Sequence, residues 1–216
     1  MFLQPLIRLG QTRKSVDTVR VIATLLPFLL RAQIPADLAR PAVTRFRVDP
    51  SRSIVRFDAA ATGHTVHGVT HQVAGEVVFD PDDLTREAEV AFQVDAVALD
   101  TGNKIRDRKM RDSHLETGRY PTIAFRSSGV RAIAPTLRPG ETQELTVKGT
   151  LSLHGVDKLL TFPVKAVRHG KDLRVTGEVP LRLSDFAIPI PRFLFIKLQD
   201  EVKVMFEVVA VADESR

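Results

Sequence analysis

From Thr44 onward, apolar and polar side chains alternate with a period of two. The pattern is clearest in residues 53–58, where Val55 and Phe57 share one face and polar residues lie between them. Such alternation is typical of a β-strand with one buried face. It constrains the fold more than any other feature, because seven further segments repeat it. These segments are 73–79, 87–99, 122–133, 144–153, 159–167, 173–183 and 201–211.

Short, polar turn sequences separate many of these segments and favour antiparallel pairing. They are rich in Pro, Gly and Asp, which favour turns, at 80–83, 138–140, 154–155 and 169–172. A parallel connection needs a crossover of about a dozen residues or more, which most of these spacings do not provide. Eight antiparallel strands with one apolar face each must close into a barrel or split into a two-sheet sandwich.

One segment, residues 101–115, breaks the alternation. It is rich in charge, places opposite charges four residues apart, and has Thr101 or Asn103 in position to cap a helix. These features predict a short helix over about 102–115. It carries too few apolar residues for a core helix, so we expect it at an edge or mouth of the β structure.

The composition excludes several classes of protein. The chain has 216 residues and no cysteine, so disulfides, cysteine-bound zinc, iron–sulfur clusters and thiol catalysis are excluded. The net charge of +5 lies mostly in the first 40 residues, which hold six Lys or Arg against two Asp or Glu. The rest of the chain is nearly neutral, so we do not expect it to bind nucleic acid.

Residues 1–41 differ from the rest and are interpreted as a basic and apolar leader, followed by one domain over 42–213. A basic stretch precedes the apolar run 21–30. That run has the length of the apolar region of a signal peptide and is too short to span a bilayer.

Two interpretations of the leader are open. Arg31 follows the apolar run directly, and no small-x-small cleavage site is evident near Ala32 or Ala36. The translated chain could also begin further along, near Val19 or Val21. If the leader is a signal peptide, the protein is periplasmic or secreted. If it is a disordered or helical extension, the protein is cytoplasmic.

Of five motif-like stretches in the domain, the most specific runs from Leu99-Asp100-Thr101-Gly102-Asn103 through Arg106-Asp107 to Tyr120-Pro121. It resembles the D-T-G-N-x-x-R-D helix and Y-P-x-hydrophobic-x-F strand of the YceI-like family of lipid- or polyisoprenoid-binding proteins. The others are 46–53, 73–82, 147–156, and 182–188 together with 200–202. The matches occur in order over about residues 44–212.

The resemblance implies an all-β, lipocalin-like, eight-stranded antiparallel barrel with the short helix near its mouth. It also implies an interior channel that binds, sequesters or transports a long apolar chain, such as a polyisoprenoid or isoprenoid quinone, without catalysis or a cofactor. A homodimer and proximity to a membrane are further expectations. Residues 62–71, rich in histidine, and 188–193, rich in proline, depart from the usual family pattern and leave the ligand's identity open.

The alternation predicts which side chains would line such a channel. The predicted lining is Val55, Phe57, Val77, Phe79, Val90, Phe92, Phe125, Leu151, Phe162, Val175 and Phe206. For a polar head group at the mouth the candidates are Asn103, Arg106 and Arg111, which would otherwise form a solvated helix face. The residues alone leave a solid core open as well, with glycines bending the strands and phenylalanines filling the interior.

Two further functions are weighed. His64, His67 and His71 suggest metal ligands, but spacings of three and four do not put all three on one face of a strand. We therefore predict no metal site and no catalytic residue. The alternatives are a small β-barrel hydrolase or metal-assisted enzyme that uses a histidine at the mouth, and a packed β-domain that binds a protein partner.

Overall fold

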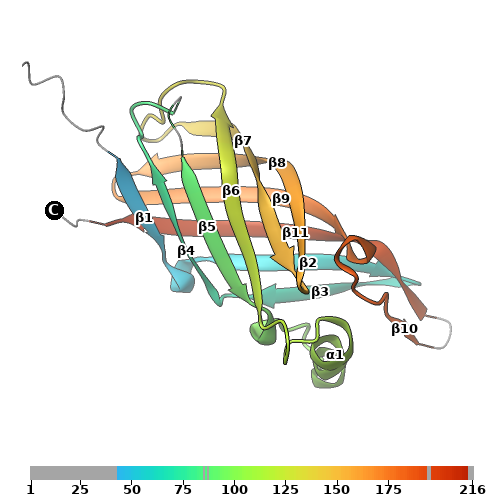
Figure 1. The fold of residues 1–216 in the computed structure, drawn as a ribbon. Helices are drawn as coiled ribbons and strands as arrows, with labels where there is room; N and C mark the ends of the chain where they lie inside the picture. The colour runs from blue at the N-terminus through green and yellow to red at the C-terminus, as the bar shows by residue number, and fades with distance from the viewer. Residues whose placement is uncertain (1–42, 85, 87, 194–195, 214–216) are drawn as a thin grey trace, which may run out of the picture. The chain divides into compact units, whose positions relative to one another are not determined.

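The computed structural model describes residues 43–213, apart from 85, 87, 194 and 195. Strands dominate, and one short α-helix lies at one end of them (Figure 1). The strands are β1 (Thr44–Val48), β2 (Ile54–Ala61), β3 (His64–Thr70), β4 (Val73–Phe79), β5 (Glu89–Asp95), β6 (Thr122–Ala132), β7 (Thr142–Leu153), β8 (Val156–His169), β9 (Asp172–Arg182), β10 (Arg192–Phe193) and β11 (Ile196–Ala212). The helical turns are η2 (Pro50–Arg52), η3 (Ala96–Ala98), α1 (Lys104–Lys109), η4 (Met110–His114) and η5 (Leu183–Phe186).

Eight strands form a closed antiparallel ring. Its order is β1-β4-β5-β6-β7-β8-β9-β11, and β1 closes it by pairing with β11 as well as with β4. Phe46 lies opposite Val77 on one side and Ala212 on the other. The eight-stranded antiparallel barrel predicted from the sequence is therefore confirmed.

The eight strands of the closed ring are not the same eight strands that the sequence alternation identified. The alternation marked β2, which pairs with β11 and β3 but lies outside the closed ring. The eight segments leave out β1, whose five residues also alternate but bury a single side chain, Phe46. A segment this short is not recognised as a strand of its own, although it is the strand that closes the barrel.

A short turn joins β1 to β2 along the same side of β11. Asp49 caps η2 by accepting a hydrogen bond from the Ser51 backbone N–H at 3.0 Å. The buried Ser53 hydroxyl donates to the Asp49 carbonyl oxygen at 2.7 Å and accepts from the Val209 N–H at 3.0 Å. The aspartate and serine of the first motif thus anchor the corner between two strands.

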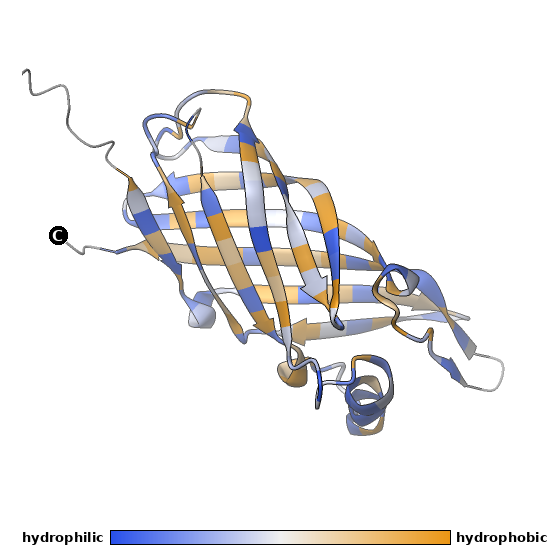
Figure 2. Ribbon diagram, viewed as in Figure 1, coloured by the Kyte–Doolittle hydropathy of each residue, from blue (hydrophilic) through white to orange (hydrophobic). Residues whose placement is uncertain are grey.

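Hydrophobic and polar residues alternate along the strands, as Figure 2 shows by colour. On β8, Leu160 and Phe162 face the interior, whereas Leu159 is 62% exposed. Adjacent side chains of a strand point to opposite faces, so the apolar set of each strand reaches the inside of the ring.

The predicted helix over about 102–115 is present as α1 followed by the π-helical turn η4. Asn103 is its N-cap and accepts hydrogen bonds from the N–H groups of Ile105 and Arg106. A two-way backbone bridge between Val69 and Asp100 holds the approach to the helix against β3. None of the helices in the described residues is long and apolar enough to cross a membrane.

Candidate ligand-binding cavity

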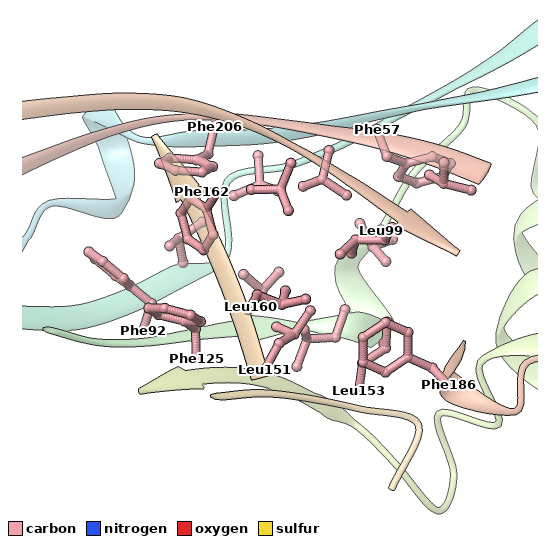
Figure 3. A pocket seen from close by; sticks show the side chains of 18 of the residues that line it. Phe57, Phe92, Leu99, Phe125, Leu151, Leu153, Leu160, Phe162, Phe186 and Phe206 are labelled. Carbon is pink, nitrogen blue, oxygen red and sulfur yellow. The ribbon is translucent and has the colours of Figure 1, made fainter. Parts of the chain in front are cut away.

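A cavity of about 820 Å³ occupies the barrel interior. Its wall is built of aliphatic and aromatic side chains from strands of the ring and from β2 and β3, and Figure 3 shows several of them converging on one space. The structure places every lining residue predicted from the sequence at this wall. They are Val55, Phe57, Val77, Phe79, Val90, Phe92, Phe125, Leu151, Phe162, Val175 and Phe206.

Glycines leave room for four of the aromatic rings along the wall. Phe206 lies directly opposite Gly177 on the neighbouring strand, and a methyl group added at Gly177 would lie 2.4 Å from Cζ of that ring. Phe57 is placed in the same way over Gly68. The same close approach occurs between Phe92 and Gly75 and between Phe125 and Gly149.

The contacts between phenylalanine rings and glycines decide between a solid core and a hollow channel, the two arrangements that the sequence left open. Each ring covers its glycine and lies along the wall, where a larger neighbour would push it toward the centre of the barrel. Large side chains beside small ones thus leave the interior hollow instead of filling it.

One end of the cavity is closed by packing. Phe46 and Phe79 stack with ring centroids 5.3 Å apart, and Leu84 and Leu137 are buried against the same cluster. The loops that carry the two leucines hydrogen-bond to each other across the end of the barrel. The Leu84 N–H donates to the carbonyl of Pro135 and the Leu137 N–H donates to that of Pro81, at 2.6 and 2.9 Å.

The opposite end is a mouth with polar lining. Ile105 and Lys109 of α1 and Arg192 of β10 line the cavity and are also exposed to solvent, so the cavity opens between these elements. The polar residues of the lining are His64, Thr101, Asn103, Arg106, Lys109, His114, Arg182 and Arg192. No acidic side chain is part of the lining in the described residues. The mouth is therefore electropositive, while the wall behind it is apolar.

A buried carboxylate fixes the loop before α1. Asp107 is 4% exposed and accepts hydrogen bonds from the backbone N–H and the hydroxyl of Thr101, at 2.9 and 2.6 Å. Burial alone would raise the pKa of Asp107, but the hydrogen bonds from Thr101 outweigh it and lower that pKa. The Arg106 guanidinium also donates to the Thr101 hydroxyl and carbonyl, at 2.8 and 2.7 Å.

The three head-group candidates do not share one position. Asn103 and Arg106 lie at the mouth, as expected for groups that would meet a ligand. Arg111 is not part of the cavity lining. Its guanidinium donates to the carbonyl oxygens of Val97 and Leu99, at 3.2 and 3.3 Å, and so joins η4 to η3.

The three clustered histidines have three different surroundings. His64 lies at the mouth, His67 Nδ1 lies 2.6 Å from Oδ1 of Asp58 on the paired strand, and His71 Nδ1 donates to the Ser53 carbonyl at 2.7 Å. Within the part of the chain that the structure describes, no three His, Asp or Glu side chains gather as metal ligands would.

Two other histidines hold the segment that crosses the mouth after β9. His154 Nδ1 donates to the Phe186 carbonyl at 3.0 Å, and His114 Nδ1 donates to the Pro189 carbonyl at 2.9 Å. Burial is the main cause that lowers the pKa of His114. Asp200 of β11 accepts a third bond, from the Ser184 N–H at 2.8 Å.

The model of the YceI-like domain family matches residues 46–210, which is most of the chain and nearly all of the barrel. The chain belongs to the YceI-like family. Its motif residues have visible structural tasks here: Asn103 caps the helix, and Asp107 and Arg106 both bind Thr101.

Curated relatives of this YceI-like chain are distant. A UPF0312 protein of Vibrio vulnificus is 26% identical over 178 residues, 79% of this chain and 88% of the relative. One of Vibrio campbellii is 28% identical over 144 residues, 63% of this chain and 72% of the relative.

Solved structures share the fold at lower identity. BcnA of Burkholderia cenocepacia superposes with a TM-score of 0.64 at 22% identity, over 76% of this chain and 99% of its own. A domain of Saccharophagus degradans described as polyisoprenoid-binding superposes with a TM-score of 0.63 at 18% identity, over 78% of this chain and 98% of its own. These likenesses establish the barrel.

Sequence reasoning missed several lining residues of the YceI-like barrel. Leu84 and Leu137 lie in loops, where a single apolar residue gives no periodic signal. Phe186 ends η5, which follows β9, and Ile188 lies just after it, in a segment without alternation. Their one signal is that large apolar side chains stand in polar turn sequences, which indicates burial against another element. The missed residues include Leu84, Leu99, Leu137, Leu153, Leu160, Phe186 and Ile188.

Proposed function

We propose that this YceI-like protein binds a long-chain apolar lipid of the polyisoprenoid or isoprenoid-quinone type inside the barrel, and sequesters or carries it. The observation that carries the proposal is the cavity itself. It is lined by hydrocarbon, closed at one end, and open at a polar mouth at the other.

The energetics favour a chain of hydrocarbon over a compact polar ligand. The cavity volume of about 820 Å³ lies within the usual range for ligand sites, roughly 300–1,000 Å³. Each methylene that moves from water into such a site contributes about 0.8 kcal/mol before ordering costs. The wall offers no charge along its length, so it selects for a tail and not for a functional group. The neighbour described as polyisoprenoid-binding supports the same class of ligand.

A polar head group would lie at the mouth. Asn103 and Arg106 lie there, together with the cations Lys109, Arg182 and Arg192. Cationic donors at the rim of an apolar cavity stabilise an acceptor-rich or anionic head group. We do not include Arg111 among the head-group ligands, because its guanidinium binds backbone carbonyls.

The arrangement supports binding and not catalysis. Among the described residues the wall carries no nucleophile, and His114 at the mouth donates its Nδ1 proton to the Pro189 carbonyl, a contact that holds the chain in place. If the leader is a signal peptide, this binding takes place in the periplasm or outside the cell, and otherwise in the cytoplasm. The homodimer stays a prediction.

A pair of adjacent leucines provides the test. Leu160 lines the cavity, whereas Leu159 is 62% exposed on the outer face of the same strand. Delipidated full-length protein would be titrated with a tritiated long-chain polyprenol delivered from cyclodextrin. Leu160→Asp should weaken binding at least about tenfold, because a carboxyl group in the wall must be desolvated by the tail.

Leu159→Asp is the matched control and should bind as the unaltered protein does. Phe92→Asp and Leu151→Asp should behave like Leu160→Asp, since both side chains line the cavity. Far-ultraviolet circular dichroism checks that each variant is folded. A folded Leu160→Asp protein that binds the polyprenol at full strength would exclude the interior as the binding site.

A further inference from the structure

The mouth carries an exposed apolar side chain at its outermost helix. Ile105 of α1 is 83% exposed and also lines the cavity. Val97 is 45% exposed, and its carbonyl accepts a hydrogen bond from Arg111 of η4, so it belongs to the same end of the barrel. A single exposed isoleucine is ordinary on a protein surface. One that stands at the opening of a hydrocarbon-lined cavity is in the path of any lipid that enters.

The charges around Ile105 are unequally exposed. Lys104, Arg108 and Lys109 of α1 are exposed to solvent. The one acidic residue of the helix, Asp107, is turned inward and binds Thr101. The solvent-facing side of α1 is therefore cationic around its apolar residue.

Charges of both signs occur elsewhere at this end. Arg182 and Arg192 line the mouth together with α1. The exposed acidic side chains include Asp95 and Asp100, which accept hydrogen bonds from the Val97 and Gly102 N–H groups, Asp112 of η4 and Asp185 of η5. The opening itself is bordered by cations, since no acidic side chain is part of the described lining.

An exposed apolar side chain surrounded by cations is complementary to the surface of an anionic bilayer. Basic residues near such a surface are attracted by its lipid head groups, and an apolar side chain on a basic helix inserts between them. A long polyisoprenoid has almost no solubility in water, so its direct route into the cavity starts in a membrane. A bilayer placed against this end would be in line with the opening.

We propose that the α1 end of the barrel docks on an anionic phospholipid surface, with Ile105 inserted and Lys104 and Arg108 on the head groups, and that the ligand passes through the mouth from that surface. The inference rests on the proposed lipid-binding function and adds an anionic membrane as the surface that the mouth contacts. A protein that delivers the lipid is the competing occupant, and the test distinguishes the two.

Vesicle flotation tests the docking. Full-length protein would be mixed with vesicles of phosphatidylcholine alone or with one third phosphatidylglycerol. We expect binding to the anionic vesicles and little to the neutral ones. Each basic residue near an anionic surface strengthens binding roughly fivefold. The variant Lys104→Glu/Arg108→Glu should therefore weaken binding at least about twentyfold, and Ile105→Asp should also weaken it.

Ile133→Asp is the matched control. Ile133 is 84% exposed, lies just past the far end of β6, and does not line the cavity. This variant should bind the vesicles as the unaltered protein does. The leader is present in every variant, so differences among them report the mouth.

Loading of polyprenol from two sources separates this inference from the proposed function. Delivered from cyclodextrin, the ligand should fill the unaltered protein and Lys104→Glu/Arg108→Glu equally, because neither of these side chains lines the cavity. Delivered from anionic vesicles, it should fill Lys104→Glu/Arg108→Glu several-fold more slowly. Equal rates from vesicles, or a protein that loads from cyclodextrin but binds neither vesicle, would overturn the docking and favour a protein donor. Failure to load from cyclodextrin would overturn the lipid-binding function itself.

Discussion

The two ends of the barrel are built from different interactions. At the closed end Phe46, Phe79, Leu84 and Leu137 are buried in one apolar cluster. At the mouth, hydrogen bonds from histidine side chains hold the segment after β9, and a buried carboxylate, Asp107, holds the approach to α1. Apolar packing dominates the first end, whereas the second combines these polar contacts with a smaller apolar cluster of Leu153, Phe186 and Ile188.

The difference indicates that the closed end stabilises the fold and that the mouth admits the ligand. A packed apolar end resists opening, because each buried side chain adds to the free energy of unfolding. An end with a smaller apolar cluster and more polar contacts is easier to open locally, and such regions are where proteins move to admit ligands. We therefore expect the closed end to keep its structure while the mouth opens locally to admit a ligand.

The largest expected effect is at the closed end. Phe46 is 1% exposed and stacks on Phe79, so Phe46→Ala should lower the free energy of unfolding by about 3–5 kcal/mol. Ile105→Ala at the mouth should change it by less than about 0.5 kcal/mol. Urea unfolding followed by circular dichroism measures both. Similar losses at the two ends would contradict the division described above.

Removing the buried carboxylate should have the next largest effect. Asp107→Ala leaves the Thr101 N–H without its acceptor and should cost about 1–3 kcal/mol near neutral pH. Because the folded protein lowers the pKa of Asp107 below its ordinary value of 3.8, this stabilisation is present above that pH and is lost as the pH falls through the folded value.

Urea unfolding at pH 7 and at pH 3 checks this effect. The difference between the variant and the unaltered protein should shrink at the lower pH. A difference that is the same at both pH values would show that the carboxylate contributes through packing alone.

Narrowing the cavity should lower the free energy of unfolding less than the Phe46→Ala and Asp107→Ala changes above, but it should weaken ligand binding. In Gly177→Ala the new methyl group meets only the end of the Phe206 ring, which can move into the empty interior. We expect a loss of less than about 1 kcal/mol, below the usual cost of overpacking a solid core, and weaker binding of the polyprenol.

Gly129→Ala is the control, because a methyl group there would meet nothing within 4 Å. Equilibrium titration with the polyprenol compares the two variants. Full-strength binding by a folded Gly177→Ala protein would show that this part of the wall does not touch the ligand.

The smallest effect concerns pH at the mouth. Burial lowers the pKa of His114 below its ordinary value of 6.5. The neutral form therefore stabilises the fold fully above that pH, and the contribution is lost as the pH falls through the folded value. Thermal unfolding at pH 7.5 and 5.5 should show a larger decrease for the unaltered protein than for His114→Gln. Equal decreases in melting temperature would show that His114 does not contribute to the loss of stability at acidic pH.

The wall of the cavity and the helix at its mouth could be predicted from the sequence, but the closed end could not. A strand repeats every two residues, so alternation alone placed Phe92, Leu151 and Phe206 at the wall. The closed end depends on Leu84 and Leu137, which meet only when two distant loops hydrogen-bond. Such contacts leave no periodic signal in either segment.

The pairing of phenylalanine with glycine shows the same limit. Phe206 and Gly177 are both visible in the sequence, but their contact depends on the register of β9 and β11. Likewise, Arg111 has the spacing of an exposed helix residue, and only the folded position of η3 shows that its guanidinium binds backbone carbonyls. Local pattern gives the face of a residue, and tertiary structure gives its partner.

Native mass spectrometry of the full-length protein, purified without detergent, tests the central claim most directly. Solvent extraction of the same sample would identify whatever is bound. The account predicts an added mass of isoprenoid type at close to one molecule per chain. A mass equal to that of the bare chain, unchanged after incubation with polyprenols and quinones, would contradict it.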